Sequence, residues 1–346
     1  MRILGIVIAL ISFLLLILGH EFGHFSVGKL LGFKINEFSV GMGPLLWSDK
    51  KGETQYSFRA IPLGGYCAFE GEDGDEEDEN GKPKEPDPRS FNRQPAWKKL
   101  PVLLAGSFNN IVIGLLILTV VFTIMGSYSP VLEAVPADKP AAAAGIQPGD
   151  KVVAVNGTHY DEWLDITQAI QNNEDSDVDI TVLRDGKEIE FKNVKIEVSE
   201  DNRKVIGIQC SLEHSVGTAV KTAFKEAGSM IRALRDFFVR LFSGKASSDD
   251  VGSIIQIIDI SGDYAVSYGL LTVIYLIGLV SVNLGFMNLL PIPGLDGGRI
   301  LFVIVRWITR GKVSDKTEAI INSVFMFLLF GLMIGLMVKD VVHMIR

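Results

Sequence analysis

The chain has 346 residues, 48% of them hydrophobic and 21% charged, with a net charge of −8. This apolar share excludes an ordinary soluble protein of this length, and the lack of a dominant basic face argues against a nucleic-acid partner. The run from Glu70 to Glu79 holds eight acidic residues and no basic one, which equals the whole net charge, so the rest of the chain is neutral overall. We expect this run to be a solvated loop, and it indicates no function.

The N-terminal segment is an uncharged run from Ile3 to Gly19 that leads into His20-Glu21-Phe22-Gly23-His24. Residues i and i+4 of a helix share a face, so His20 and His24 can bind one Zn²⁺ together. Glu21 projects about 100° away and can activate a water molecule. Ionisable groups are costly in a bilayer, which favours a metal site over a chance match. A signal peptide is disfavoured because no small-residue cleavage site follows.

Three further uncharged runs bring the number of predicted transmembrane helices to four. Each is long enough to cross ~30 Å of hydrocarbon. They are Leu100 to Leu132, Tyr264 to Leu295 and Ala319 to Val338. Lysine and arginine cluster before the second span and between the third and fourth, which predicts that both loops are cytoplasmic. Both chain ends and the region 130–265 then face outward.

Residues 130–213 are predicted to form a small β-rich domain. A turn cluster at 145–150 precedes an apolar strand, Val152 to Val155, and the hairpin dipeptide Asn156-Gly157. Helical spacing and strand alternation follow, at Trp163, Ile166 and Ile170 and then at Val178, Ile180 and Val182. A further turn is expected at Asp185-Gly186.

The stretch from Ala141 to Gly157, with the pattern A-A-x-A-G-x-x-P-G-D-x-V-x-x-V-N-G, resembles PDZ domains of bacterial proteases. PDZ domains bind peptides by adding a strand to a sheet edge. Ile206, Gly207 and Ile208 are candidates for that edge, and an ordinary core strand is the alternative. The segment 214–263 is predicted to hold an amphipathic helix and a linker. The helix either lies on the membrane surface or packs against the PDZ-like domain.

Two histidines leave a zinc ion short of a protein ligand. The third predicted span ends in N-L-L-P-I-P-G-L-D-G-G at 288–298, where prolines and glycines break the helix. The first and third spans cross in the same direction, so His24 and Asp296 match in depth. Asp296 is therefore the predicted third ligand, and a helix cap is its alternative. Asn288 is predicted to contact the oxyanion or the substrate backbone, unless it only bonds freed carbonyls.

With these motifs in place, nearly the whole chain resembles the site-2 protease family of intramembrane zinc metalloproteases. The motifs are H-E-F-G-H at 20–24, N-x-x-P-x-P-x-x-D-G at 288–297, G-M-G-P at 41–44 with P-L-G-G-Y at 62–66, and Ala105-Gly106 with Asn110. The single PDZ-like insertion resembles the regulator-of-sigma-E-type branch, some of whose members carry two. Ser107 stands where many members have proline.

The resemblance implies that His20, His24 and Asp296 bind one Zn²⁺ per chain, with Glu21 as base and Asn288 in catalysis. It also implies substrate contacts at Asn110 and in the membrane-associated β region, at Gly41, Met42 and Gly43. The Met42 loop can pair with an extended substrate or be a structural hairpin. The implied partners are the lipid bilayer and single-span membrane proteins, such as anti-sigma factors or remnant signal peptides, whose outer segments can meet the PDZ-like domain.

The predicted fold is a mainly α-helical polytopic membrane protein with a membrane-associated β region and an inserted α/β PDZ-like domain. The predicted parts are helix 1 (1–32), the β region (33–69), an acidic loop (70–99), helix 2 (100–129), the PDZ-like domain (130–213), the amphipathic segment (214–263), helix 3 (264–298) and a basic loop with helix 4 (299–346). We expect the bacterial cytoplasmic membrane as location, with the active site near the cytoplasmic side. The alternative functions are an inactive PDZ membrane scaffold, which has no use for Glu21, and a membrane metal carrier, which needs ligands that the other spans lack.

Overall fold

The computed structural model describes residues 2–72, 87–199, 201–245, 268–310 and 315–345, with the single positions 261, 266 and 313. Residues 73–86 of the predicted acidic loop, and the predicted 214–263 segment beyond residue 245 apart from position 261, lie outside these ranges. The chain divides into two compact units. Unit 1 comprises Met1–Leu118 and Ala223–Arg346, and unit 2 comprises Thr119–Thr222.

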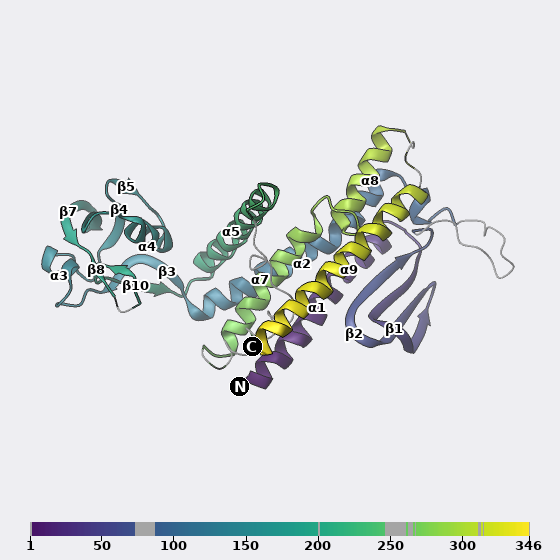
Figure 1. Ribbon diagram of the computed structural model, residues 1–346, viewed down its shortest axis with the longest axis horizontal. Coiled ribbons are helices and arrows are strands. Elements are labelled where there is room, and N and C mark those ends of the chain that lie inside the picture. The colour runs from purple at the N-terminus through teal and green to yellow at the C-terminus, as the bar shows by residue number, and fades with distance from the viewer. Residues whose placement is uncertain are drawn as a thin grey trace. The chain divides into compact units, whose positions relative to one another are not determined.

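Four described helices are long and apolar enough to cross a membrane. They are α1 (Arg2–Leu30), α2 (Ala96–Met125), α7 (Leu270–Asn288) and α9 (Asp315–Ile345), labelled in Figure 1. The shortest apolar stretch has 19 residues, which at 1.5 Å per residue extends about 28 Å, close to the thickness of the hydrocarbon layer. The number of apolar helices in this part of the chain agrees with the four predicted spans.

The second helix lies earlier in the sequence than its predicted range of 100–129. α2 begins at Ala96, because the two lysines of its first turn can extend their charged ends away from the apolar region. It ends at Met125, where Gly126 adopts a φ of +84° outside the helical region. The next residue, Ser127, begins a strand of unit 2.

The third predicted span, 264–298, is interrupted, as its prolines and glycines indicate. α7 ends at Asn288, residues 289–295 are irregular, and α8 (Asp296–Ile308) follows. The side-chain oxygen of Asn322 in α9 accepts a hydrogen bond from the Gly294 N–H at 3.2 Å. The fourth apolar helix therefore supports the irregular segment that precedes Asp296.

Close contacts hold α1, α2 and α7 together. A Cβ atom added at Gly23 would lie only 2.5 Å from the backbone oxygen of Ala105, so α1 and α2 touch backbone to backbone. Small residues allow such approaches in membrane helix bundles. Between α2 and α7, the Ser281 hydroxyl donates to the backbone oxygen of Asn110 at 2.8 Å.

The β region consists of two long strands, β1 (Ile35–Lys51) and β2 (Thr54–Phe69), drawn as a hairpin in Figure 1. The first part of β1 is paired on both sides, since Val40 faces Gly65 at one flank and Phe58 at the other. The second part of β1 pairs only with the first part of β2. The end of β2 around Gly65 therefore forms one edge of this sheet, and it contacts α1.

The outer part of this sheet carries large apolar side chains that are exposed. Their exposed fractions range from 45% to 63%, and they are Met42, Leu45, Leu46, Trp47, Phe58 and Ile61. Several exposed apolar side chains in one part of a sheet are typical of a surface that contacts protein or membrane. It accords with the predicted membrane-associated β region.

Unit 2 is a mixed α/β unit around one sheet, with the strand order β10-β3-β4-β6-β7. Its strands are β3 (Ser127–Ala134), β4 (Lys151–Val155), β5 (Thr158–His159), β6 (Asp177–Arg184), β7 (Lys187–Lys195), β8 (Glu197–Val198), β9 (Lys204–Val205) and β10 (Gln209–Glu213). Its two short helices are α3 (Pro140–Ala144) and α4 (Trp163–Asn172).

The local patterns predicted for this unit are confirmed. The two turn dipeptides, Asn156-Gly157 and Asp185-Gly186, both adopt the positive φ values that tight hairpins require. The predicted helical and strand residues converge in one hydrophobic core, which includes Trp163, Ile166, Ile170, Val178, Ile180 and Val182.

The amphipathic helix α5 (Val216–Phe242) crosses the boundary between the two units. Its alanines at positions 219, 223 and 227 are buried, whereas Phe224 and Ile231 are 62% and 50% exposed. The helix therefore buries only its small side chains in the described structure. Placement of the larger ones on a membrane surface stays a prediction.

Candidate metal centre

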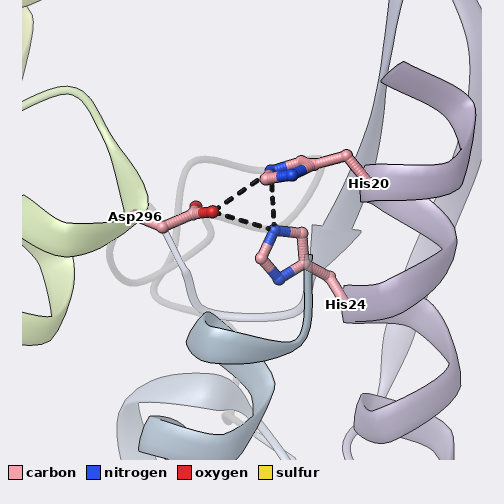
Figure 2. Close-up of side chains that lie close together, drawn as sticks. All are labelled: His20, His24 and Asp296. Atoms are coloured by element: carbon pink, nitrogen blue, oxygen red, sulfur yellow. Dashed lines mark hydrogen bonds and ion pairs between the residues drawn. The ribbon is translucent and has the colours of Figure 1, made fainter. Parts of the chain in front are cut away.

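His20 and His24 lie one turn apart on α1 and point their rings at a common place, as Figure 2 shows. Their Nε2 atoms are 3.2 Å apart, and the two residues are only 8% and 7% exposed. Helix periodicity alone produces this pairing, because residues four apart stand above one another on one face.

Asp296 approaches the same place from the start of α8 (Figure 2). Its Oδ2 atom is 3.1 Å from Nε2 of His20 and 3.3 Å from Nε2 of His24. The capping position of α8 is held by Leu295, and no side chain caps that helix. The geometry thus favours the ligand role of Asp296 over the capping role.

The three side chains fit a zinc ion by their donor set. Within the described ranges they are the one group of three or more potential ligands whose ligand atoms lie within 4.8 Å of one another. The Nδ1 atom of His24 is 2.8 Å from the backbone oxygen of Val102, which can only accept, so Nδ1 carries a proton and Nε2 is the nitrogen available to a metal ion. Lone pairs brought this close repel unless a cation or a proton lies among them. Two imidazoles and one carboxylate leave a fourth position open, as in catalytic zinc sites.

The backbone of α2 forms one wall of the centre at Gly106. A Cβ atom there would lie 2.3 Å from Nε2 of His24 and 2.8 Å from Cε1 of His20. Any side chain at this position would fill the space that a metal ion needs. From the sequence alone, Gly106 is indicated only as part of a family motif, because a glycine in an apolar run carries no other signal.

Glu21 lies beside the ligands and outside the ligand group. The neighbouring element is the edge of β2, where a Cβ atom added at Gly65 would lie 3.8 Å from Cγ of Glu21. The predicted base therefore borders the edge of β2 as well as the ligands. The sequence indicates Gly65 only through the P-L-G-G-Y motif.

Three polar side chains surround the ligands. Asn110 and Asn288 each place Nδ2 near Nδ1 of His20, at 3.3 Å and 3.5 Å. The Ser107 hydroxyl donates to Oδ2 of Asp296 at 3.4 Å, a contact that the sequence did not indicate. Asn110, expected to touch substrate, is fully buried behind His20, whereas Asn288 is only partly buried.

The other predicted substrate contacts belong to the β region and to unit 2. Met42 pairs with Ile61 in the β region, between Gly41 and Gly43, whose φ values are positive. In unit 2, Ile206 belongs to the hydrophobic core, and its backbone oxygen accepts from the N–H of Ala141 at 2.9 Å. Gly207 and Ile208 follow it before β10 begins. Substrate binding at these residues stays a prediction.

Comparison with known proteins finds one family model and several relatives whose names agree with it. Residues 8–332 match the model of peptidase family M50. "Putative zinc metalloprotease CA_C1796" of Clostridium acetobutylicum is 33% identical over 348 residues, covering 100% of both chains. "Putative zinc metalloprotease FN1322" of Fusobacterium nucleatum is 34% identical over 346 residues, covering 96% of this chain and 97% of its own. "Regulator of sigma-W protease RasP" of Bacillus subtilis is 26% identical over 409 residues, with 96% and 97% covered.

One solved structure matches part of the chain. It is the crystal structure of the PDZ domain of the SdrC-like protein Lmo2051 from Listeria monocytogenes, which is 22% identical. The match covers 25% of this chain and 86% of that chain, with a TM-score of 0.21. A score this low does not establish a shared fold.

Proposed function

The chain belongs to peptidase family M50, and from this membership we propose that His20, His24 and Asp296 hold its zinc ion and that Glu21 is its catalytic base. The protein is a zinc metalloprotease that hydrolyses peptide bonds within transmembrane segments of membrane proteins. The observation that supports the site assignment most directly is the approach of Asp296 Oδ2 to both Nε2 atoms. The two histidines lie on α1 and Asp296 begins α8, far away in the sequence, so chance does not explain their convergence.

Each residue then has a defined task. Bound Zn²⁺ supplies a Lewis acid that lowers the pKa of water and polarises a carbonyl group. Glu21 accepts the proton of the attacking water and passes it to the leaving amide nitrogen. Asn288 donates from its side-chain amide to the substrate carbonyl oxygen as negative charge develops there. Val102 holds the ring of His24 in one orientation, because its carbonyl oxygen accepts from Nδ1.

A transmembrane substrate must lose its helical hydrogen bonds before it can be cut. Each freed backbone group needs a new partner in a dry environment. The edge of β2 around Gly65 offers such partners by strand addition, and it borders Glu21. We therefore assign the substrate strand to this edge. Gly41, Met42 and Gly43 then shape the adjoining part of the same sheet.

Hydrolysis also requires water at a site among apolar helices. A cavity of about 620 Å³ has walls that include Leu103, which follows Val102 in the sequence, and Gly294, two residues before Asp296. Its polar lining residues are Glu72, Asn92, Lys99, Arg299, Arg306, Glu318, Asn322 and Ser323. The basic loops around it indicate the cytoplasmic side, from which we propose that water reaches the centre.

The proposed substrates are single-span membrane proteins such as anti-sigma factors or remnant signal peptides. Unit 2 is assigned a PDZ-like role outside the membrane, where it binds or excludes the outer segments of substrates. The positive loops support this orientation, with both chain ends outside and the centre near the cytoplasmic side.

The test of the site is made on the purified full-length protein in detergent. Zinc content and cleavage of a model transmembrane peptide are measured for the wild type, for His20→Ala and for His159→Ala, an exposed histidine of β5, as a matched control. We expect one zinc per wild-type and control chain, and loss of both zinc and cleavage in His20→Ala. Full zinc content in His20→Ala would refute the proposed ligand set.

A further inference from the structure

The side-chain amide of Asn110 has a hydrogen-bond partner for its nitrogen but none for its oxygen among the described residues. The residue is fully buried in α2, and its Nδ2 atom lies 3.3 Å from Nδ1 of His20. Its Oδ1 atom is buried and has no hydrogen-bond partner among the described residues. A buried polar atom without a partner is costly, so it indicates a state in which a partner is present.

The protonation of His20 supplies that second state. When Nε2 of His20 binds a metal ion, the ring proton sits on Nδ1, which then needs an acceptor. The two ends of an asparagine amide have nearly the same shape, so a half-turn about the Cβ–Cγ bond exchanges them with little other movement. The exchange would place Oδ1 opposite Nδ1 and satisfy both atoms.

Without metal, the orientation of the Asn110 amide seen in the structure also gives His20 a hydrogen-bond partner. Nδ2 of Asn110 then donates to an unprotonated Nδ1, and the proton on Nε2 of His20 points to Asp296 at 3.1 Å. An asparagine amide can therefore serve both tautomers of the ring. Leucine can serve neither, and an ionised aspartate can serve only the tautomer that binds metal.

Asn288 competes for the same ring atom, and burial separates the two roles. Its Nδ2 atom is farther away, at 3.5 Å, and the residue is partly exposed. Asn110 is enclosed between α2 and α7, where the Ser281 hydroxyl holds its backbone oxygen. A pairing of His20 with Asn110 leaves the amide of Asn288 available to substrate.

We infer that Asn110 is a positioning residue for His20, which accepts from Nδ1 when zinc is bound and donates to it when zinc is absent, and that it does not contact substrate. The inference rests on the proposed zinc site. It gives each histidine its own acceptor, the Val102 carbonyl for His24 and the Asn110 amide for His20. Such outer partners fix the tautomer and the ring orientation of metal ligands.

The test measures zinc affinity of the detergent-purified full-length protein by competition with a chelator. Asn110→Leu should weaken zinc binding about 10- to 100-fold, and Asn110→Asp should restore it to within about threefold of wild type. Should Asn110→Leu fail to fold, Asn110→Ala takes its place with the same expected weakening. Asn283→Leu is the matched control, because Asn283 is an exposed asparagine of α7. It should leave zinc affinity unchanged.

Three outcomes would overturn the inference. They are wild-type zinc affinity in Asn110→Leu, equal weakening in Asn283→Leu, and an affinity in Asn110→Asp as weak as in Asn110→Leu. The first of these, combined with lost cleavage, would return Asn110 to a substrate-binding role. His20→Ala is measured in parallel, and if it keeps its zinc, the proposed ligand set fails instead.

Discussion

His24 of α1 donates a hydrogen bond from Nδ1 to the backbone oxygen of Val102 in α2, at 2.8 Å. Because the acceptor is a backbone atom, no side-chain substitution at residue 102 removes it directly. The contact fixes which nitrogen of His24 is available to a metal and couples the ligand to the packing of two apolar helices. The site is therefore sensitive to helix contacts as well as to its own residues.

The base assignment predicts a separation of zinc binding from catalysis. Glu21→Gln keeps the size of the side chain and removes its ability to accept a proton. We expect full zinc content and a loss of cleavage of about 10²–10⁴-fold, the usual contribution of general base catalysis. Both are measured on purified protein with a model transmembrane substrate. Residual activity within about tenfold of wild type would rule out Glu21 as the base.

Asp296 and Asn288 should fail in different ways. Asp296→Ala removes a ligand and should lower zinc occupancy, whereas Asn288→Ala should slow turnover with zinc retained. Zinc affinity and kcat are measured for both variants. Unchanged metal affinity in Asp296→Ala would contradict the ligand role and leave Asp296 as a local element of α8.

Gly106→Ala is predicted to prevent metal binding, because the added methyl group takes up space beside the ligand side chains. The added Cβ atom would lie 2.3 Å from Nε2 of His24, so the ring or the helix must shift. We expect loss of zinc and of cleavage. Gly331→Ala in α9 is the control, since a Cβ atom there meets no atom within 4 Å. Normal zinc content in Gly106→Ala would show that this wall does not confine the site.

Unit 2 should be removable without loss of the catalytic unit. Ser127 and Glu213 face each other across the ladder of β3 and β10, so a deletion of the sequence between Gly126 and His214 can be closed by a short linker. We expect the predicted core deletion of 131–213, or this wider one, to keep zinc and to widen cleavage to substrates with intact outer domains.

Two results would contradict this role of unit 2. One is an unchanged choice of substrates after the deletion. The other concerns orientation, since a membrane-impermeant thiol reagent should label an engineered cysteine in unit 2 on intact cells. Labelling only after the cells are opened would place the unit inside.

The ion pair of Asp150 and Arg184 should make unit 2 sensitive to acid. Burial alone would raise the pKa of Asp150, but hydrogen bonds from Arg184 and from the Gln147 N–H bring it below its ordinary value. A carboxyl group with a lowered folded-state pKa stabilises the fold above its unfolded value near 4, and this stability is lost as the pH falls through the folded-state value.

Thermal unfolding of a fragment of residues 127–213 therefore should show falling stability below about pH 4. Arg184→Met should destabilise the fragment at neutral pH, because it removes the ion-pair partner of the buried Asp150 carboxylate. A profile that is flat from pH 6 to pH 2 would disprove the contribution of this pair.

The convergence of His20, His24 and Asp296 could be predicted from sequence because it depends on short-range patterns. The histidines lie four residues apart on one helix, and Asp296 follows a helix break that the prolines and glycines of 288–298 make visible. The same holds in unit 2, where turn dipeptides and alternating strands define the elements. Patterns of this kind need no knowledge of distant contacts.

The surroundings of the centre could not be predicted in the same way. The roles of Gly106, Val102 and Gly65 depend on backbones from distant parts of the sequence lying against α1. Within an apolar run, neither the glycine at 106 nor the valine at 102 indicates that its backbone lies against a histidine. The burial of Asn110 behind His20 likewise follows from helix packing, which periodicity does not reveal.

The ligand set also has a consequence for the time at which the protease becomes active. His20 and His24 leave the ribosome early, whereas Asp296 comes near the end of the chain. At about 5–20 residues per second, the interval is on the order of tens of seconds. During that time the nascent chain holds two ligands and a base but no complete centre. A growing chain is therefore unable to cut its membrane neighbours, and a product truncated before α8 remains harmless.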